Sequence, residues 1–513
     1  MALIGLMMIA TWPIWAYPIP PLGDYANHLT RMHIVASLPS DPDLARYYRV
    51  DWQVIPNLAM DLIVPPLSTL IGLNAAGQVF LTAIFGTIAI GMMLLGRSLF
   101  GRWSAAPLFG LPFLYNGMLL IGCLNYLLGV GLALCALAAW VALETKSLWI
   151  KLGLAGAMVI PLFFCHLYSV GLFCVGLLAF ELLKQSNARR WTWARRAREF
   201  FVPAIAFLPV LPLLLASPTA DLSGNIIWDM HDKSSGFTLA LVTYSGWIGA
   251  VLFAALVVAA FLAVWLGLLS AHPVTPFLLF TGITIYFLMP RELFDTCMTD
   301  QRMPIALLFM LLATIDLRLP KQAWGAVIGI AAVFLGIRVV EINSHWRTEA
   351  NEIADVQKSF TRLRRGAKVL VATADPTRGY TAGDFGLVHA VSLASVSRSA
   401  LTTRTFAVSG KQILQVKDAY KDLVDQYDVA PPDIDMLKKF KKQNGPNPRV
   451  YWHHWPVRYD YLYVLFTDKQ FASPDPNALK LIYAGDRFRL FAMQSGSPPS
   501  IVRPNIIASR RRG

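Results

Sequence analysis

The sequence predicts a polytopic α-helical membrane protein of about eleven transmembrane helices, followed by a C-terminal α/β domain. Of the 513 residues, 56% are hydrophobic and only 15% are charged, whereas soluble domains are about 25% charged. The charges are unevenly spread, since 35 of the 341 residues in 1–341 are charged, against 41 of the 172 in 342–513. We therefore divide the chain into a transmembrane domain, 1–341, and a soluble domain, 342–513.

The transmembrane helices are predicted from apolar stretches, because a helix needs about 20 such residues to cross a bilayer. Residues 150–184 are long enough for two helices, with a break near Cys165 and His166. The N-terminal stretch has no Lys or Arg before it, which favours a first membrane helix over a cleaved signal peptide. The predicted spans are 2–20, 76–96, 104–120, 124–142, 150–165, 167–184, 200–216, 244–269, 274–290, 303–318 and 321–340.

Basic residues near the span ends predict the orientation, because Lys and Arg favour the cytoplasmic side. They flank four short connections, which fall on one side of the membrane if the number of spans is odd. The N-terminus is then cytoplasmic, while the long first loop, 21–75, and residues 342–513 lie on the outer side. The basic residues are Arg97, Arg102, Lys146, Lys151, Lys184, Arg189, Arg190, Arg195, Arg196, Arg198, Arg318 and Lys321.

Residues 342–513 carry the pattern of a small α/β domain. Short apolar runs rich in β-formers predict strands, and 411–426 and 433–442 have helical periodicity. This part holds 11 of the 14 net positive charges of the chain, which favours contact with anionic lipid headgroups. No nucleic-acid-binding motif accompanies the charge, so we expect no nucleic-acid partner. The predicted strands are Lys368–Ala372, Tyr461–Phe466, Leu479–Tyr483 and Phe488–Met493.

The first outer loop holds the most informative group of polar residues. The sequence Pro20-Pro21-Leu22-Gly23 ends the first span, and Asp24 follows at the N-cap position of a helix predicted over 24–38. In that helix Asp24, His28 and Arg31 are spaced i, i+4, i+7 and share one face. A carboxylate, an imidazole and a guanidinium would then converge at the membrane surface. The alternative is an ordinary N-cap followed by a solvated helix face.

Three further residues are candidates for a site at the outer surface. His166 lies between two spans, where a titratable side chain is costly unless it faces a cavity; the alternative is an interfacial histidine bonded to a backbone carbonyl. Lys233 follows two carboxylates in the loop 228–233, which otherwise is a solvated loop. Arg302 opens the tenth span and can bind a phosphate through its planar fork, or act as a snorkelling anchor.

The first loop also carries a resemblance. An Asp just after the first membrane helix, in a long outer loop with amphipathic helices, resembles the GT-C superfamily of membrane glycosyltransferases. Protein O-mannosyltransferases and the lipid A aminoarabinose transferase belong to this superfamily. The segment from Asn57 through Pro65-Pro66-Leu67 to the apolar span that ends in Arg97-Ser-Leu-Phe-Gly101 is similar to their juxtamembrane helix and second span.

One feature departs from this superfamily. Many GT-C proteins carry a second acidic residue in the outer loop between spans three and four, but the segment 115–126 contains none. Asn125 is the candidate replacement, and Asp51 or Asp61 are the alternatives. The absence weakens a metal-dependent mechanism, although a divalent cation stays open, and it leaves room for a divergent or inactive member.

The resemblance implies a glycosyltransferase of the bacterial inner membrane with its C-terminal domain in the periplasm. It would transfer a sugar from a polyprenyl-phosphate-linked donor to a lipid, glycan or protein acceptor at the outer face of the membrane. Asp24 would be the catalytic base, and a divalent cation is the one cofactor left open. A transporter or flippase is the alternative, although no two-half repeat is visible, and a non-catalytic GT-C-like assembly subunit is another. Substrate-binding roles are expected for His28, Arg31, Asn125, His166, Lys233 and Arg302.

Overall fold

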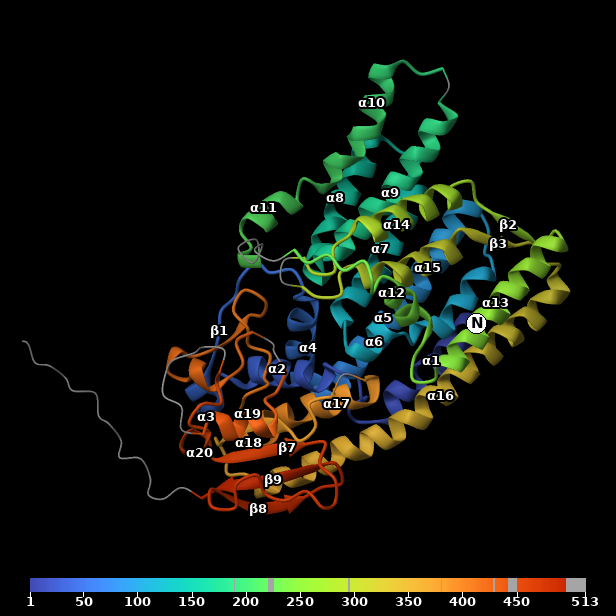
Figure 1. Cartoon of the computed structure of the whole chain (residues 1–513). Coiled ribbons are helices and arrows are strands. Elements are labelled where there is room, and N and C mark those ends of the chain that lie inside the picture. The colour runs from blue at the N-terminus through green and yellow to red at the C-terminus, as the bar shows by residue number, and fades with distance from the viewer. Residues whose placement is uncertain are drawn as a thin grey trace, which may run out of the picture.

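The computed structural model describes residues 1–188, 190–219, 226–293, 296–379, 381–427, 430–441 and 450–494. The chain forms a bundle of apolar helices, and the C-terminal residues form a sheet with short helices at one end of it (Figure 1). By length and composition, six helices of the described part are suited to cross a membrane: Leu73–Phe100, Leu124–Ala142, Leu148–Cys165, Leu167–Asn187, Gly246–Trp265 and the one that begins at Trp324.

The apolar helices coincide with the predicted spans. His166 separates α8 from α9 by adopting an extended backbone, with φ of −171°, as the predicted break requires. Because α1 and α14 are shorter than 18 residues, the count of about eleven spans stays a prediction. These helices are α1 (Ala2–Ala16), α5 (Leu73–Phe100), α7 (Leu124–Ala142), α8 (Leu148–Cys165), α9 (Leu167–Asn187), α13 (Gly246–Trp265), α14 (Thr275–Leu288), α15 (Met303–Ala313) and α16 (Trp324–Ser359).

Two of the predicted spans are interrupted. Span 104–120 divides into the 3-10 helix η1 (Ala106–Leu114) and α6 (Gly117–Ile121), and span 200–216 divides into η2 (Val202–Phe207) and α11 (Val210–Leu215). Proline is the common cause, because it has no N–H to donate and clashes with the preceding turn. Prolines occur at 107, 112, 203, 209 and 212.

Helix α16 passes through the predicted domain boundary without a break. Its 36 residues run from Trp324 to Ser359, so residues 341 and 342 are neighbours within one continuous helix. No flexible linker therefore separates the two predicted domains at this point, and the division at 341 stays a prediction. The helix extends along one side of the molecule to the sheet (Figure 1).

The C-terminal sheet has five strands in the order β5-β4-β7-β9-β8. Strand β4 is parallel to β5 and β7, while β9 is antiparallel to both β7 and β8. The four predicted strands are confirmed, and β5 joins them. The strands are β4 (Lys368–Thr373), β5 (Leu401–Thr402), β7 (Tyr461–Leu465), β8 (Leu479–Ala484) and β9 (Phe488–Met493); nearby helices include α17 (Ala382–Ala390), α18 (Ala394–Arg398), α19 (Ile434–Lys439) and α20 (Trp455–Arg458).

One secondary-structure prediction is wrong. Residues 411–426 form the strand β6 (Leu414–Val416) and the 3-10 helix η8 (Asp418–Leu423) instead of an α-helix. Strand β6 pairs antiparallel with β1 (Tyr48–Val50) from the first outer loop. A partner this distant in sequence leaves no local pattern, so tertiary pairing overrides the helical periodicity. The prediction for 433–442 is confirmed where α19 lies.

The first outer loop and the C-terminal part share one hydrophobic core. Ile34, Leu44 and Tyr48 of the loop are fully buried together with residues of the sheet such as Leu370 and Leu462. Arg365 of the C-terminal part also forms ion pairs of 2.7 and 2.8 Å with two aspartates of this loop, at positions 41 and 43. The loop is built from α2 (Tyr25–Ser37), α3 (Pro42–Tyr47), β1 and α4 (Ala59–Ile71).

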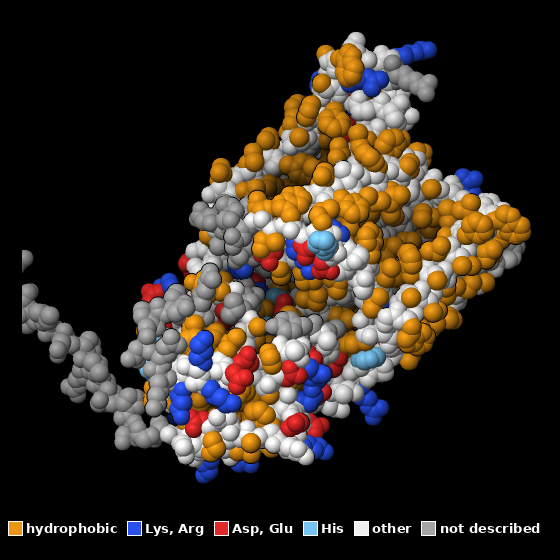
Figure 2. Space-filling model, in the orientation of Figure 1, with side chains coloured by type: hydrophobic (Ala, Val, Ile, Leu, Met, Phe, Trp, Pro, Cys, Tyr) orange, Lys and Arg blue, Asp and Glu red, His pale blue; other side chains and the backbone are white. Residues whose placement is uncertain are grey.

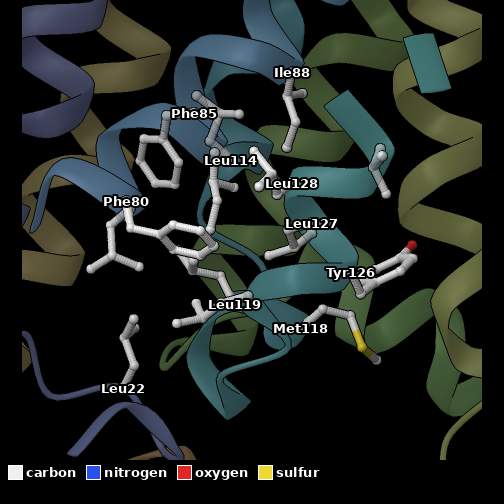
Figure 3. Packing of buried hydrophobic residues seen from close by; sticks show 14 of the residues in the cluster. Leu22, Phe80, Phe85, Ile88, Leu114, Met118, Leu119, Tyr126, Leu127 and Leu128 are labelled. Carbon is white, nitrogen blue, oxygen red and sulfur yellow. The ribbon is translucent and has the colours of Figure 1, made fainter. Parts of the chain in front are cut away.

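The surface reflects the two compositions of the chain. Hydrophobic side chains cover the helical bundle, and Lys, Arg, Asp and Glu gather over the C-terminal sheet and near α10 (Trp193–Phe201) (Figure 2). Helix α13 is largely exposed, since only 11% of its most apolar stretch is buried inside the protein. This is expected of a helix that faces lipid. Inside the bundle, α5, η1, α6 and α7 pack their aliphatic and aromatic side chains together with Leu22 (Figure 3).

The shared core gives a prediction for Leu44, which is completely buried. Truncation to Ala should destabilise the C-terminal part by about 2–5 kcal/mol, because it removes buried methyl groups and leaves a cavity. Limited proteolysis of the C-terminal part in the full-length protein would measure this. Leu70→Ala is the control, since Leu70 is 80% exposed. Equal protease resistance in both variants would show that the first loop does not support the sheet.

Candidate active site

A cavity of about 530 Å³ lies between α2, α7, α9, the segment before α15 and the C-terminal part. Six of the seven predicted site residues line it, and they come from distant parts of the sequence. Lys233 is the exception. The six are Asp24, His28, Arg31, Asn125, His166 and Arg302.

Helix α2 places Asp24, His28 and Arg31 along one wall of the cavity, as their spacing predicts. The side chain of Asp24 makes no capping hydrogen bond to α2, so the plain N-cap interpretation does not account for it. Its backbone N–H instead donates to the carbonyl of Ile121 at 2.8 Å. Gly122 follows with φ of 107°, and a Cβ there would lie 2.8 Å from that of Asp24. A glycine is therefore required beside this carboxylate.

The carboxylate of Asp24 contacts a histidine that sequence reasoning missed. Oδ1 of Asp24 lies 3.3 Å from Nε2 of His389 in α17. His389 is only 2% exposed. No local motif surrounds it, and 365 residues separate it from its partner, so only the fold reveals the pair.

His28 is buried next to Arg31. Burial, together with the positive charge of Arg31, lowers the pKa of His28 to about 3. The imidazole is therefore neutral near pH 7. Its Nδ1 has no hydrogen-bond partner among the described residues, and its ring lies against Phe406 at 5.4 Å between centroids. His28 thus offers the cavity a neutral imidazole.

Arg31 is neutralised by an acid outside the cavity. Its Nη2 donates to Oδ2 of Asp61 at 2.8 Å, and both side chains are 1% exposed. Asp61 does not line the cavity, and Asp51 accepts a hydrogen bond from Gln53 elsewhere. Neither aspartate takes the place of the second acid of the GT-C pattern. Among the described lining residues, Asp24 is the one carboxylate.

Asn125 ties the first loop to α7. Its Oδ1 accepts the N–H of Met60 at 2.9 Å, and its Nδ2 donates to the carbonyl of Asn57 at 2.7 Å and to the side chain of Asn57 at 2.9 Å. All three hydrogen bonds join the N-terminal turn of α7 to the start of α4. The amide therefore braces the cavity wall at this point.

Arg302 and His166 meet at the opposite wall. His166 caps α9, since its Nδ1 accepts the N–H of Tyr168 at 3.1 Å. Its Nε2 lies 2.7 Å from Nη1 of Arg302, which can only donate. A neutral imidazole has one acceptor nitrogen, so the N–H of Tyr168 and Nη1 of Arg302 compete for it. Nη2 of Arg302 donates to the carbonyl of Cys297 at 3.4 Å, and Nε of Arg302 has no partner among the described residues.

Tyr126 and a buried ion pair hold Arg302 in this position. The hydroxyl of Tyr126 donates to the carbonyl of Arg302 at 2.6 Å, and the guanidinium lies 5.5 Å from the centre of the same ring. Lys233 forms an ion pair of 2.8 Å with Asp300, in the 3-10 helix η4 (Asp300–Arg302). It also donates to the carbonyl of Met289 at 2.6 Å. The structure therefore places Lys233 behind the cavity wall, where it supports η4.

The remaining walls are apolar and come mainly from α9 and α14. Leu172 and Val175 of α9 face the same space as Ile285 of α14 and Met289 that follows it. A cavity with cationic donors at one wall and aliphatic side chains at another suits an amphipathic ligand. Within the described residues, no three His, Cys, Asp or Glu side chains gather into a group that could hold a metal ion.

The fold is similar to that of a solved membrane protein. Over 96% of this chain and 97% of the other, it aligns with the crystal structure of ArnT from Cupriavidus metallidurans bound to undecaprenyl phosphate. The TM-score is 0.53 and the sequence identity is 12%. No protein-family model and no curated protein sequence matches the chain. The structural likeness shows a GT-C-like fold, which confirms the resemblance seen in the first outer loop.

The buried neutral histidines predict an acid-labile fold. Because the pKa of His28 falls below its unfolded value, its contribution to stability is complete above about pH 6.5 and is lost as the pH falls toward 3. Between pH 6.5 and 5 the loss should approach 2 kcal/mol, at about 1.4 kcal/mol per pH unit. Melting temperatures of the detergent-solubilised protein across this range would measure it.

His28→Gln should make this pH dependence shallower, because glutamine does not titrate. The matched control is His231→Gln, since His231 is exposed. An unchanged slope in His28→Gln would show that His28 is not buried in its neutral form.

Proposed function

We propose that the protein is a glycosyltransferase of the bacterial inner membrane that uses a polyprenyl-phosphate-linked sugar. The observation that carries the proposal is the cavity, which combines a carboxylate, the guanidinium of Arg302 and an apolar wall. The GT-C-like fold supports it, and the solved structure of similar fold is described as bound to undecaprenyl phosphate. The acceptor is a lipid, glycan or protein with a free hydroxyl group.

Asp24 acts as the general base in this proposal. The acceptor oxygen forms a bond to the anomeric carbon of the sugar, and its proton passes to the carboxylate of Asp24. The bond from that carbon to the phosphate oxygen breaks, and the phosphate leaves with the electron pair. The sugar is thereby transferred with inversion. Asp24 suits this role because it is the carboxylate among the described lining residues and because general bases act within hydrogen-bond reach.

Arg302 and His166 stabilise the leaving phosphate. Nη1 of Arg302 lies 2.7 Å from Nε2 of His166, and a phosphate oxygen would accept hydrogen bonds from the guanidinium, whose Nε has no partner among the described residues. Donors that already point to the place where negative charge develops need no reorganisation during the reaction. Arg31 contributes less charge, because Asp61 neutralises it, and Lys233 acts only by supporting Arg302 through Asp300.

The lipid part of the donor is placed against the aliphatic side chains of α9 and α14. Those helices belong to the apolar bundle, so a polyprenyl chain can remain in hydrocarbon surroundings while its phosphate reaches Arg302. We place the cavity at the outer face of the membrane, because the basic loops predict the cytoplasm at the other end. Two basic loops lie together there, since Arg102 pairs with Asp316 and Arg318 donates to Ser270. In this proposal no metal ion takes part in the reaction.

Asp24→Asn should abolish most transfer while leaving the fold intact. The side chain of Asp24 makes no capping bond to α2, and asparagine retains the shape, so helix α2 should be preserved. Loss of the general base costs about 10²–10⁴-fold in rate. The measurement is release of polyprenyl phosphate from a polyprenyl-phosphate sugar by the purified protein in lipid vesicles. Asp51→Asn, in the same loop but outside the cavity, is the control. Activity of Asp24→Asn within a few-fold of the parent would favour a transporter or an assembly subunit.

Arg302→Lys tests the phosphate role. Lysine keeps the charge but lacks the planar pair of donors, so kcat/KM should fall by about 10- to 100-fold, the equivalent of one hydrogen bond to a charged group. Arg318→Lys is the control, because Arg318 lies at the other end of the bundle and donates to Ser270. Full activity in Arg302→Lys would remove Arg302 from the phosphate site.

A further inference from the structure

The contact between Asp24 and His389 belongs to a hydrogen-bonded chain that begins at Asn27. Two backbone groups fix the orientation of the Asn27 amide. The N–H of Phe406 can only donate, and it lies 2.9 Å from Oδ1 of Asn27. The carbonyl of Arg404 can only accept, and it lies 2.5 Å from Nδ2. The oxygen and nitrogen of this amide are therefore assigned by their partners.

The orientation of Asn27 in turn fixes the tautomer of His389. The amide nitrogen of Asn27 lies 3.0 Å from Nδ1 of His389. Because an amide NH₂ group can only donate, Nδ1 must be the acceptor nitrogen of the ring. The proton of the neutral imidazole then lies on Nε2, which is 3.3 Å from Oδ1 of Asp24. The interaction is that of an N–H donor with a carboxylate.

The surroundings of His389 keep its imidazole neutral and in place. Its ring lies between Phe385 and Phe406, with centroid distances of 5.3 Å to each. Burial, the positive charge of Arg404 and the nearby His28 lower the pKa of His389 well below its usual value. A neutral imidazole donates one hydrogen bond through Nε2 without supplying a charge that would bind the carboxylate as a strong ion pair.

We propose that His389 is a positioning residue, which orients the carboxylate of Asp24 from the C-terminal part of the chain. This inference rests on the proposed role of Asp24 as the base. An N–H donor 3.3 Å from the carboxylate favours its ionised form, which is the form that accepts a proton. The reaction would therefore require α17 to be docked on α2, so the C-terminal part completes the active site.

Other charged and titratable groups surround this pair and also affect its pH dependence. They come from α2, the α6–α7 connection, α7, α9, the segment before α15 and the C-terminal part. They are His28, Arg31, Cys123, Tyr126, His166, Tyr168, Cys297, Arg302, Arg404 and Lys411. All of them are left unchanged in the variants below, which alter only position 389.

Two amide variants separate the two nitrogens of His389. Asparagine places its amide near Nδ1, so His389→Asn keeps an acceptor for Asn27 but removes the donor to Asp24. Glutamine reaches the position of Nε2, so His389→Gln keeps a donor to Asp24. In His389→Asn we expect the acid limb of the pH profile of kcat/KM to shift to higher pH by about one unit. It should stay within about 0.3 pH unit of the parent in His389→Gln. A role in folding alone would leave the limb in place in both variants, and that result would overturn the proposal.

A second measurement does not depend on transfer activity. The full-length protein in lipid bilayers, with its histidines labelled with ¹⁵N, should show a neutral Nε2–H imidazole at pH 7 and at pH 5 that is absent from the spectrum of His389→Asn. An Nδ1–H tautomer, or an imidazolium at pH 7, would overturn the hydrogen-bonded chain. A parent protein that consumes no polyprenyl-phosphate sugar would contradict the proposed function, whereas the tautomer would still decide the hydrogen bond.

Discussion

Helix α2 is enclosed on all sides, and the cavity depends on that enclosure. Nine of its 13 residues are buried, including polar ones such as Asn27, Thr30 and Arg31. Each of these three finds a partner on another element, in the C-terminal part for Asn27 and Thr30 and in α4 for Arg31. Buried polar groups without partners would cost several kcal/mol. Docking of α2 between the bundle and the sheet therefore determines where Asp24 and His28 face.

The buried charges near the cavity fall into two kinds. Arg31 pairs with Asp61 and Lys233 pairs with Asp300. The positive charge of each is therefore balanced by a carboxylate of the protein itself. Arg302 instead contacts His166 and donates to the carbonyl of Cys297 at 3.4 Å. These partners carry no negative charge, so a bound phosphate would stabilise this buried cation. The protein thus holds its strongest attraction for an anion at one wall, opposite to the carboxylate on α2.

Local sequence patterns predicted what depends on local geometry. The spacing of Asp24, His28 and Arg31 predicted a shared face, and the apolar stretches predicted helices in the right places. Tertiary partners escaped prediction. His389 carries no signal in its own segment. Lys233 is predicted in the site, although its ion pair with Asp300 holds it behind the cavity wall. Residues 414–416 form a strand because β1 pairs with them. The span count, the domain division and the catalytic roles remain predictions.

Asp24 is the one carboxylate among the described residues that line the cavity, and Asn125 lines it as well. The side-chain amide of Asn125 forms three hydrogen bonds with Asn57 and Met60. It therefore stabilises the cavity wall without adding negative charge. The Nε2 of His389 lies 3.3 Å from that carboxylate. In the proposed mechanism the C-terminal part is therefore more than a cover for the bundle, since it supplies a side chain that positions the base.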